Sequence, residues 1–290
     1  MSLTLFAEQA LNGLQLGTML FLMASGLTLV FGIMNLINLA HGSLYMVGAY
    51  FAATLFPLTG SLLLAGVGAF IGVLVLGMAL EMTVLRGFYR RDHLDQVLAT
   101  FGLIMFFNET VRILWGPQAY FLALPAGLEG SVELIPGTPY PIYRLLIIAV
   151  GLAVAGGLYL LISKSRIGML IRAGASNRTM VEALGVNIRA LYTVVFGLGA
   201  ALAALAGTMA GPLLAVQVGM GDGILILTLV VIVIGGIGSV RGAFLAAVLL
   251  GMLDTFGRML LPASLAEMAI YILMALVLYH RPQGLFPAHG

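Results

Sequence analysis

The sequence has no cysteine and little charge. None of its 290 residues is Cys, and Asp, Glu, Lys and Arg together make up 8%, whereas a soluble domain carries about 25% charged residues. Without cysteine, neither disulfide bridges nor thiolate metal sites are available. With so little charge, a soluble fold of this size cannot cover its own surface. The composition therefore excludes a soluble globular protein and indicates a chain that lies in a bilayer.

Long apolar runs make up most of the chain. Hydrophobic residues account for 61% and the mean hydropathy is +1.13. The runs do not alternate as the strands of a membrane β-barrel do, and a bilayer core asks for about 20 apolar residues per spanning helix. We expect an all-α polytopic integral membrane protein, one domain over residues 1–290 with eight or nine transmembrane helices. The apolar segments are 10–32, 37–57, 61–85, 97–114, 142–162, 191–211, 223–240, 243–260 and 265–280.

The cationic residues predict the topology. Eight of the thirteen Lys and Arg residues lie in two loops, as Arg86, Arg90 and Arg91 and as Lys164, Arg166, Arg172, Arg178 and Arg189. By the positive-inside rule both loops face the cytoplasm, and the loop 115–143, which has no Lys or Arg, lies outside. Nine spans then place the N-terminus outside and the C-terminus in the cytoplasm. A re-entrant or broken segment within residues 1–60 reduces the count to eight. The start MSLTLFAEQA lacks a cationic leader region, so we expect it to be retained.

Small residues recur at four-residue spacing in two segments. Membrane helices pack closely where small side chains let their backbones approach. We expect both stripes to pack against neighbouring helices. They are Gly199, Ala203, Gly207 and Gly211, and Ser239, Ala243, Ala247 and Gly251.

The stretch NLINLAHGSLYMVGAY, residues 35–50, carries polar residues in an apolar surrounding. If it is helical, Asn35, Asn38, His41, Tyr45 and Gly48 share one face. Asn and Gly also suit a helix break, which membranes tolerate where the unwound backbone lines a cavity. The polar groups either line a solute path or form hydrogen bonds that fix helix packing. We select Asn35, Asn38, His41, Ser43 and Tyr45 as path residues. His41 has no metal-ligand neighbour at helical spacing, so we expect no metal site.

A second informative stretch is VIVIGGIGSVRGAFLAAVLLG, residues 231–251. It matches neither the phosphate loop nor the dinucleotide fingerprint, so nucleotide binding is excluded here. Gly238 and Ser239 precede an apolar run as Gly42 and Ser43 do, which suggests an internal repeat with the path at the interface of its two halves. We take Gly236, Gly238 and Ser239 as the element that faces the polar stretch.

The charged residues within the apolar segments define an alternative function. A stand-alone secondary carrier uses membrane carboxylates as proton relays, and Glu109, Asp254 and Glu267 are the candidates, two of them with Arg112 and Arg258 at helical spacing. His, Asp and Glu are too scattered to form a catalytic set. We therefore expect no enzyme activity and no cofactor.

Four stretches carry a resemblance to a known family. They are GLTLVFGIMNLINLAHGSLYMVGAY, RAGASNRTMVEALGVNIRALYTVVFGLGAALAALAG, VGMGDGILILTLVVIVIGGIGSVRGAF and HRPQGLF. Together they resemble the permease subunits of bacterial branched-chain amino-acid ABC importers of the Liv type, and the LivH-like subunit in particular. The resemblance implies an inner-membrane importer of branched-chain or other small amino acids; related permeases serve urea and short amides. It also implies a second, LivM-like permease subunit, two ATP-binding subunits and a periplasmic binding protein. Nucleic acid is not an expected partner.

The resemblance further implies that the loop of about residues 163–190 couples to the ATPase. Physically, an exposed helix of mixed charge with Asn177 or Ser176 as N-cap and Gly185 as terminator suits that task. The spacing is compressed relative to the family's coupling motif, and its Ile-x-Leu-Pro tail is missing. Family members also often have a Lys where this chain has Thr228. The residues assigned to coupling are Asn177, Arg178, Glu182, Ala183, Gly185, Asn187 and Arg189.

Overall fold

The computed structural model describes residues 3–135 and 137–286, most of them helical. Each of the nine expected apolar segments contains one helix. These are α1 (Leu3–Met34), α2 (His41–Thr59), α3 (Leu62–Thr83), α4 (His93–Trp115), α5 (Ile142–Lys164), α8 (Ile188–Ala210), α9 (Met220–Gly235), α10 (Val240–Leu260) and α11 (Ala263–His280). Short elements connect them: the 3₁₀ turn η1 (Leu85–Phe88), α6 (Arg166–Ser176) and α7 (Arg178–Ala183).

Six helices in the described part are long and apolar enough to cross a membrane: α1, α3, α4, α5, α8 and α10. Helices α9 and α11 are apolar but shorter. Helix α2 has 19 residues and opens on His41, Gly42 and Ser43, which lowers its hydropathy. The structure is therefore that of a polytopic membrane protein, and the count of eight or nine crossings stays a prediction.

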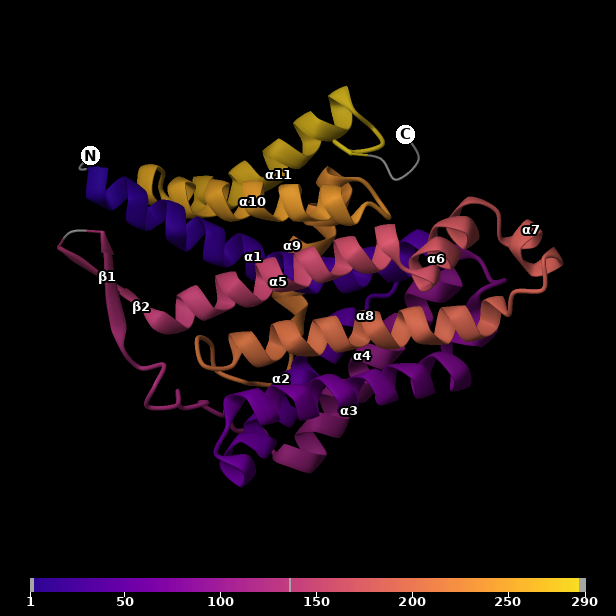
Figure 1. Cartoon of the computed structure of the whole chain (residues 1–290), viewed down its shortest axis with the longest axis horizontal. Coiled ribbons are helices and arrows are strands. Elements are labelled where there is room, and N and C mark those ends of the chain that lie inside the picture. Colours follow the sequence, from indigo (N-terminus) through magenta and orange to yellow (C-terminus); the bar gives the residue numbers. More distant parts are fainter. Residues whose placement is uncertain (1–2, 136, 287–290) are drawn as a thin grey trace.

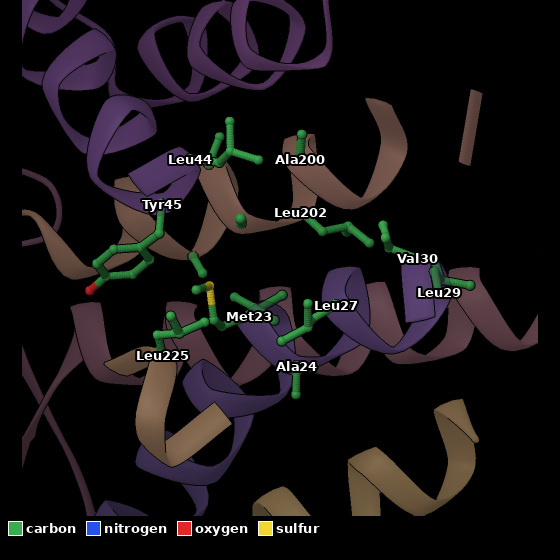
Figure 2. Close-up of a cluster of buried hydrophobic side chains, with 14 of the residues drawn as sticks. Met23, Ala24, Leu27, Leu29, Val30, Leu44, Tyr45, Ala200, Leu202 and Leu225 are labelled. Carbon is green, nitrogen blue, oxygen red and sulfur yellow. The ribbon is translucent and has the colours of Figure 1, made fainter. Parts of the chain in front are cut away.

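Helices α1 and α8 form the centre of the bundle. In their most apolar windows 83% of α1 and 72% of α8 is buried, against 22% for α4 and for α5. Helix α1 packs mainly on α10 and α8, and α8 packs on α3 and α2. Figure 2 shows side chains of α1, α2, α8 and α9, among them Met23, Leu44, Ala200 and Leu225, gathered in this core.

The small-residue stripes pack helix against helix, as predicted. Gly199 of α8 lies against the backbone of Gly26 in α1, and Gly207 lies against the carbonyl of Tyr45 in α2. Gly251 of α10 meets Gly13 and Gly17 of α1 in the same way. A Cβ atom at any of these positions would enter the neighbouring backbone, so glycine sets the distance between these helices.

A short hairpin departs from the all-α prediction. Strands β1 (Ser131–Ile135) and β2 (Thr138–Pro141) pair antiparallel within the expected outer loop. The loop is too rich in Pro and Gly for a helix, and its backbone groups pair as strands instead. Figure 1 shows the hairpin at the end of the bundle where α1 begins, and α6 and α7 at the other end.

The two arginine-rich loops lie together at the α6–α7 end. The Arg86 guanidinium donates to the Thr193 hydroxyl at 2.9 Å, and the rings of Tyr89 and Tyr192 meet edge to face at 5.4 Å. The hairpin loop without Lys or Arg lies at the opposite end (Figure 1). The positive charges of these two loops therefore gather at one end of the bundle.

Candidate translocation site and coupling surface

The polar stretch 35–50 contains a helix break. Helix α1 ends at Met34, Asn35 has a left-handed φ of 51°, and α2 begins only at His41. The single polar helical face is therefore wrong, and the alternative of a break is observed. Asn tolerates the left-handed region better than most residues. A second break, with positive φ at Gly236 and Gly238, separates α9 from α10. The internal repeat itself stays a prediction.

Asn38 and His41 lie inside the protein beside this break. The Nε2 atom of His41 is 3.3 Å from the Met23 carbonyl oxygen, and its Nδ1 has no hydrogen-bond partner among the described residues. Both polar atoms of the Asn38 side chain are also buried and unpaired there. Buried polar groups are rarely left unsatisfied because each costs about 1–3 kcal/mol. These atoms therefore keep unused hydrogen-bonding capacity inside the described protein.

Helices α2 and α9 begin against each other. Gly42 in the first turn of α2 lies against the carbonyl of Gly221 in the first turn of α9, and the Gly219 N–H lies 3.3 Å from the Met46 sulfur. His41 contacts Met23, well inside the 32-residue α1. Two helix N-termini, each with a partial positive charge, therefore meet within the bundle. Discontinuous helices that meet at mid-depth commonly form solute sites in transporters.

A cavity of about 1460 Å³ lies beside α6. The end of α1, α5, α6, the α9–α10 turn and residues 282–283 surround it. Its wall includes Asn35, Gly238 and Ser239. The hydroxyl of Thr28, another lining residue, is buried and has no hydrogen-bond partner among the described residues. The cavity is larger than the roughly 300–1,000 Å³ typical of small-molecule pockets.

The structure divides the predicted path residues into two groups. Asn35, Gly238 and Ser239 line the cavity. The others lie outside it: Asn38, His41, Ser43 and Tyr45 are buried around the α2–α9 contact, and Gly236 packs against the carbonyls of Gln283 and Phe286. Helix α9 connects the two groups, since it begins at Gly221's contact with Gly42 and ends beside the cavity.

Two arginines give the cavity a positive charge. Arg172 and Arg241 line it, and its lining contains no Asp or Glu. Neither forms an ion pair with a described residue. The Arg241 guanidinium lies over the Tyr159 ring at 5.0 Å, a cation–π contact that holds it at the wall. In the sequence, Arg172 indicates only topology, and no spacing rule links it to Arg241, which lies 69 residues further along the chain (241 minus 172).

The candidate relay carboxylates are paired. Glu109 binds Arg112 at 2.9 Å, and Arg258 binds both Asp254 at 2.9 Å and Glu267 at 3.8 Å. Among the described residues no group of three His, Cys, Asp or Glu side chains is arranged to hold a metal ion. These contacts give each of the three acids a structural explanation.

The segment predicted to couple to an ATPase has the caps that its residue types predict. The Asn177 side chain accepts from the Met180 N–H at 3.0 Å and caps α7. Gly185, at φ 85°, donates to the Glu182 carbonyl, and Val186 donates to the Val181 carbonyl, which together form a Schellman ending. Asn187 then caps α8 through the Ala190 N–H at 3.1 Å. The turn between α7 and α8 is therefore well defined.

Apolar side chains stand out from α7 and its end. Met180 is 63% exposed and Leu184 77%, and Glu182, Ala183 and Arg189 are exposed around them. The Arg178 guanidinium lies 3.5 Å from the Tyr192 hydroxyl, which links α7 to α8. We name Met180, Glu182, Ala183, Leu184 and Arg189 the α7 surface.

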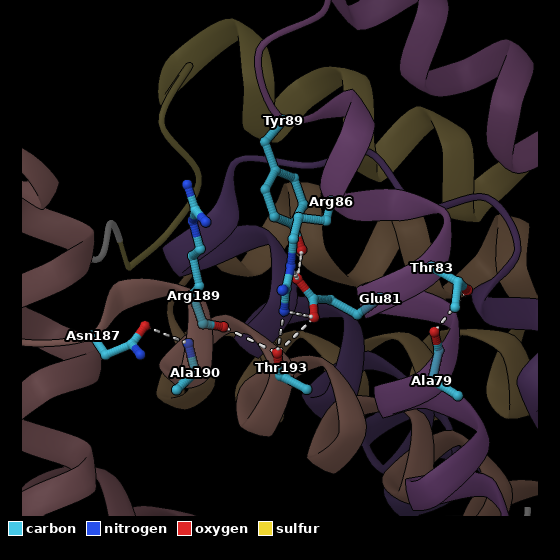
Figure 3. Close-up of polar contacts among 9 residues, drawn as sticks. All are labelled: Ala79, Glu81, Thr83, Arg86, Tyr89, Asn187, Arg189, Ala190 and Thr193. Atoms are coloured by element: carbon cyan, nitrogen blue, oxygen red, sulfur yellow. Dashed lines mark hydrogen bonds and ion pairs between the residues drawn. The ribbon is translucent and has the colours of Figure 1, made fainter.

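A buried carboxylate fastens α3 to α8 at this end of the bundle (Figure 3). The Glu81 side chain is fully buried. It accepts from the Tyr89 hydroxyl at 2.6 Å, from the Thr193 hydroxyl at 2.6 Å and from Arg86 at 2.9 Å. Burial, and then the hydrogen bond to Glu81, raises the pKa of the Tyr89 phenol above its usual value. Tyr89 therefore remains a hydrogen-bond donor at neutral pH.

The comparisons with known proteins decide the family. The model of the family described as branched-chain amino acid transport system / permease component matches residues 9–278. This chain belongs to that family. The family member BraD of Pseudomonas aeruginosa, a high-affinity branched-chain amino acid transport system permease protein, is 32% identical, with 97% of this chain and 95% of BraD covered.

Further relatives extend the comparison. LivH of Salmonella typhimurium is 29% identical over 97% of this chain and 95% of its own length. A probable branched-chain amino acid transport permease protein LivH of Methanocaldococcus jannaschii is 29% identical over 82% of this chain and 76% of its own. No solved structure matches the chain. The resemblance found in the sequence is confirmed, and the chain is a multi-pass membrane permease.

Proposed function

We propose that this chain is the transmembrane permease subunit of a binding-protein-dependent ABC importer for branched-chain or other small amino acids. The family match over residues 9–278 carries this proposal. In the complete importer the chain pairs with a second, LivM-like permease subunit, two ATP-binding subunits and a periplasmic binding protein. It lies in the bacterial inner membrane with its N-terminus outside and the α6–α7 end in the cytoplasm. The gathering of the arginine-rich loops at that end supports this orientation.

The solute path follows α9. It passes the α2–α9 contact, where Asn38 and His41 hold unpaired polar atoms, and leaves through the cavity lined by Asn35, Gly238 and Ser239. The backbone contact of Gly42 with Gly221 closes the path between them. Transport then requires α2 and α9 to separate.

The positive charge of the cavity supports an amino acid, rather than urea or a short amide, as the transported solute. Arg172 and Arg241 face a cavity without acidic residues, and guanidinium groups bind carboxylates through charge-assisted hydrogen bonds. Urea and short amides carry no charge that would draw on these arginines. A carboxylate-bearing solute is the one that this wall selects.

The α7 surface contacts the ATPase. It combines exposed Met180 and Leu184 with the charges of Glu182 and Arg189, an apolar centre with a polar rim as in protein interfaces. The caps at Asn177 and Gly185 keep its shape fixed, so that it transmits a push as a rigid body. Replacing Glu182 and Arg189 together is expected to uncouple ATP hydrolysis from uptake without preventing assembly.

The deciding experiment is uptake in proteoliposomes. Labelled leucine, urea and acetamide are offered to vesicles that hold this chain alone, and to vesicles that hold the complex with ATP and the binding protein. Leucine uptake only by the complete, ATP-supplied system is the expected result. Uptake by the chain alone identifies a secondary carrier or channel, and urea or acetamide uptake by the complete system overturns the amino-acid assignment.

A further inference from the structure

Asp222 is a charged residue that the described protein does not neutralise. It lies in the first turn of α9, its side chain is exposed, and it forms no ion pair with a described residue. The apolar segment expected from the sequence begins at residue 223, one residue after this acid. Its neighbours show that it is not a residue of the membrane surface.

The start of α9 lies well inside the bundle. Gly221 touches Gly42, and the adjacent His41 contacts the carbonyl of Met23. Helix α1 continues from Met23 to Met34, eleven residues further (34 minus 23). At about 1.5 Å per residue this is about 16 Å, roughly half of a hydrocarbon core about 30 Å thick. Asp222, next to Gly221, therefore lies about 16 Å from the α6–α7 end of α1, inside the bundle rather than at that end.

An exposed carboxylate at this depth needs a partner. Hydrocarbon contact is costly for an ionised acid, and charged residues within membrane segments mostly face water, a counter-charge or a transported solute. The charge of Asp222 does complement the positive N-terminus of α9. This interaction with the helix dipole accounts for an acid in the first turn of α9. It does not account for the exposure of the Asp222 side chain at this depth.

The surroundings of Asp222 suit one kind of solute. Ile226, one turn further along α9, is 52% exposed, which places an apolar surface beside the carboxylate. On the α2 side of the Gly42–Gly221 contact, Asn38 and His41 supply buried, unpaired hydrogen-bonding atoms. A negative group, an aliphatic surface and spare polar atoms complement an ammonium group, an aliphatic side chain and a carboxylate.

We propose that Asp222 binds the ammonium group of the amino acid on its way along α9. This inference rests on the proposed function, because it names how that path recognises its solute. Arg172 and Arg241 at the cytoplasmic cavity lie at the other end of α9 and take the opposite charge of the same zwitterion. Charge recognition is thereby divided between the two ends of one helix.

Binding to the purified complex of permease and ATPase subunits, in lipid nanodiscs without binding protein, tests the proposal. Equilibrium dialysis measures the affinity for labelled leucine, with competition by 3-methylbutylamine, which lacks the carboxylate, and by 4-methylpentanoate, which lacks the amine. We expect the amine to compete with leucine through Asp222, and Asp222→Asn to abolish that competition, whereas competition by the acid reports on the arginines of the cavity and should not change in Asp222→Asn. Asp222→Asn is expected to weaken leucine binding at least about tenfold, Asp222→Glu to retain most of it, and Glu109→Gln, which alters a paired acid on α4, to leave it unchanged.

Three results overturn the inference. These are absence of competition by the amine, unchanged affinity in Asp222→Asn, and no saturable leucine binding to the wild-type complex. The competition arm uses the wild-type protein, so it decides even if Asp222→Asn fails to assemble. The proteoliposome assay tests the proposed function independently of Asp222. If the wild type shows ATP-driven leucine uptake there while the binding results contradict a role for Asp222, only this inference fails.

Discussion

Gly42 and Gly221 lie backbone against backbone where α2 and α9 begin. A Cβ atom at Gly42 would stand 2.6 Å from the Gly221 carbonyl oxygen, and one at Gly221 would collide with Gly42. Two helix starts can approach this closely only when neither residue has a side chain. The contact closes the proposed path, and its separation opens it.

Gly221→Ala is expected to destabilise the permease, because the added methyl group enters the backbone of Gly42. Overpacking of this kind costs about 1–3 kcal/mol, which thermal unfolding in detergent measures as a lower Tm. Gly223→Ala in the same helix is the matched control, since no atom lies within 4 Å of that position. Equal stability of the two variants would show that the close approach does not exist.

Asn38→Leu is expected to separate stability from transport. The Asn38 amide is buried with both polar atoms unpaired, so an apolar side chain of similar size removes a desolvation penalty of about 1–3 kcal/mol. The Tm should stay or rise, while uptake falls at least about tenfold, which corresponds to about 1.4 kcal/mol. Normal uptake by a stable Asn38→Leu variant would remove Asn38 from the path.

His41→Ala is likewise expected to impair uptake more than stability.

Arg86→Met is expected to destabilise the end of the bundle that holds α6 and α7. It leaves the fully buried Glu81 with hydrogen bonds from Tyr89 and Thr193 but without its counter-charge. Removing one partner of a buried ion pair costs about 3–5 kcal/mol, and the 35% exposure of the Arg86 side chain places the loss toward the lower figure.

Arg112→Met provides the control for that variant. The Arg112–Glu109 pair has the same 2.9 Å length, but both side chains are more than half exposed. Exposed pairs contribute about 0–1 kcal/mol, so the Tm of Arg112→Met should differ little from that of the wild type. If Arg86→Met and Arg112→Met unfold at the same temperature, the Arg86–Glu81 ion pair contributes no more to stability than an exposed pair.

Leu184→Glu is expected to weaken binding of the ATP-binding subunits while the permease itself stays folded. Leu184 is 77% exposed and follows the α7 helix, so the isolated subunit loses no packing. Co-purification of the ATP-binding subunits and ATP hydrolysis are the measurements. Leu184→Met, which keeps an apolar side chain, should retain both. Full retention by Leu184→Glu would move the ATPase contact away from the α7 surface.

Arg241→Gln is expected to lower leucine uptake without loss of assembly, because the cavity then keeps only Arg172 as a positive wall residue. Arg166→Gln, on α6 but outside the cavity lining, is the matched control for general loss of positive charge at this end. Initial uptake rates at saturating ATP measure the effect. Equal rates in the two variants would contradict a role for the cavity charge in solute recognition.

Much of the fold was predictable because a bilayer imposes simple rules. Spans need about 20 apolar residues, and the nine apolar segments each contain one helix. Local cap chemistry was equally readable: Asn177 and Gly185 start and end α7 as their residue types predict. The break after Met34 was one of two alternatives that the sequence left open, because Asn35 fits either a helix or a left-handed turn.

The candidate site was only partly predictable. The polar residues from Asn35 to Tyr45 are visible as residue types, but their division between a cavity and a buried contact depends on where the chain turns back at residues 35–40. Arg172, Arg241 and Thr28 share one cavity, although they lie on three different elements. Asp222 stands next to a predicted boundary, where an error of one residue decides whether an acid counts as membranous.

The sequence by itself determined the membrane class, the helical segments, the end at which positive charge gathers and the family, because hydropathy, caps and motifs are local properties. The tertiary structure alone decided that α2 and α9 begin against each other inside the bundle and that Glu81 joins α3 to α8. Such contacts depend on how closely distant backbones approach. That distance follows from the packing of the whole bundle rather than from any one segment.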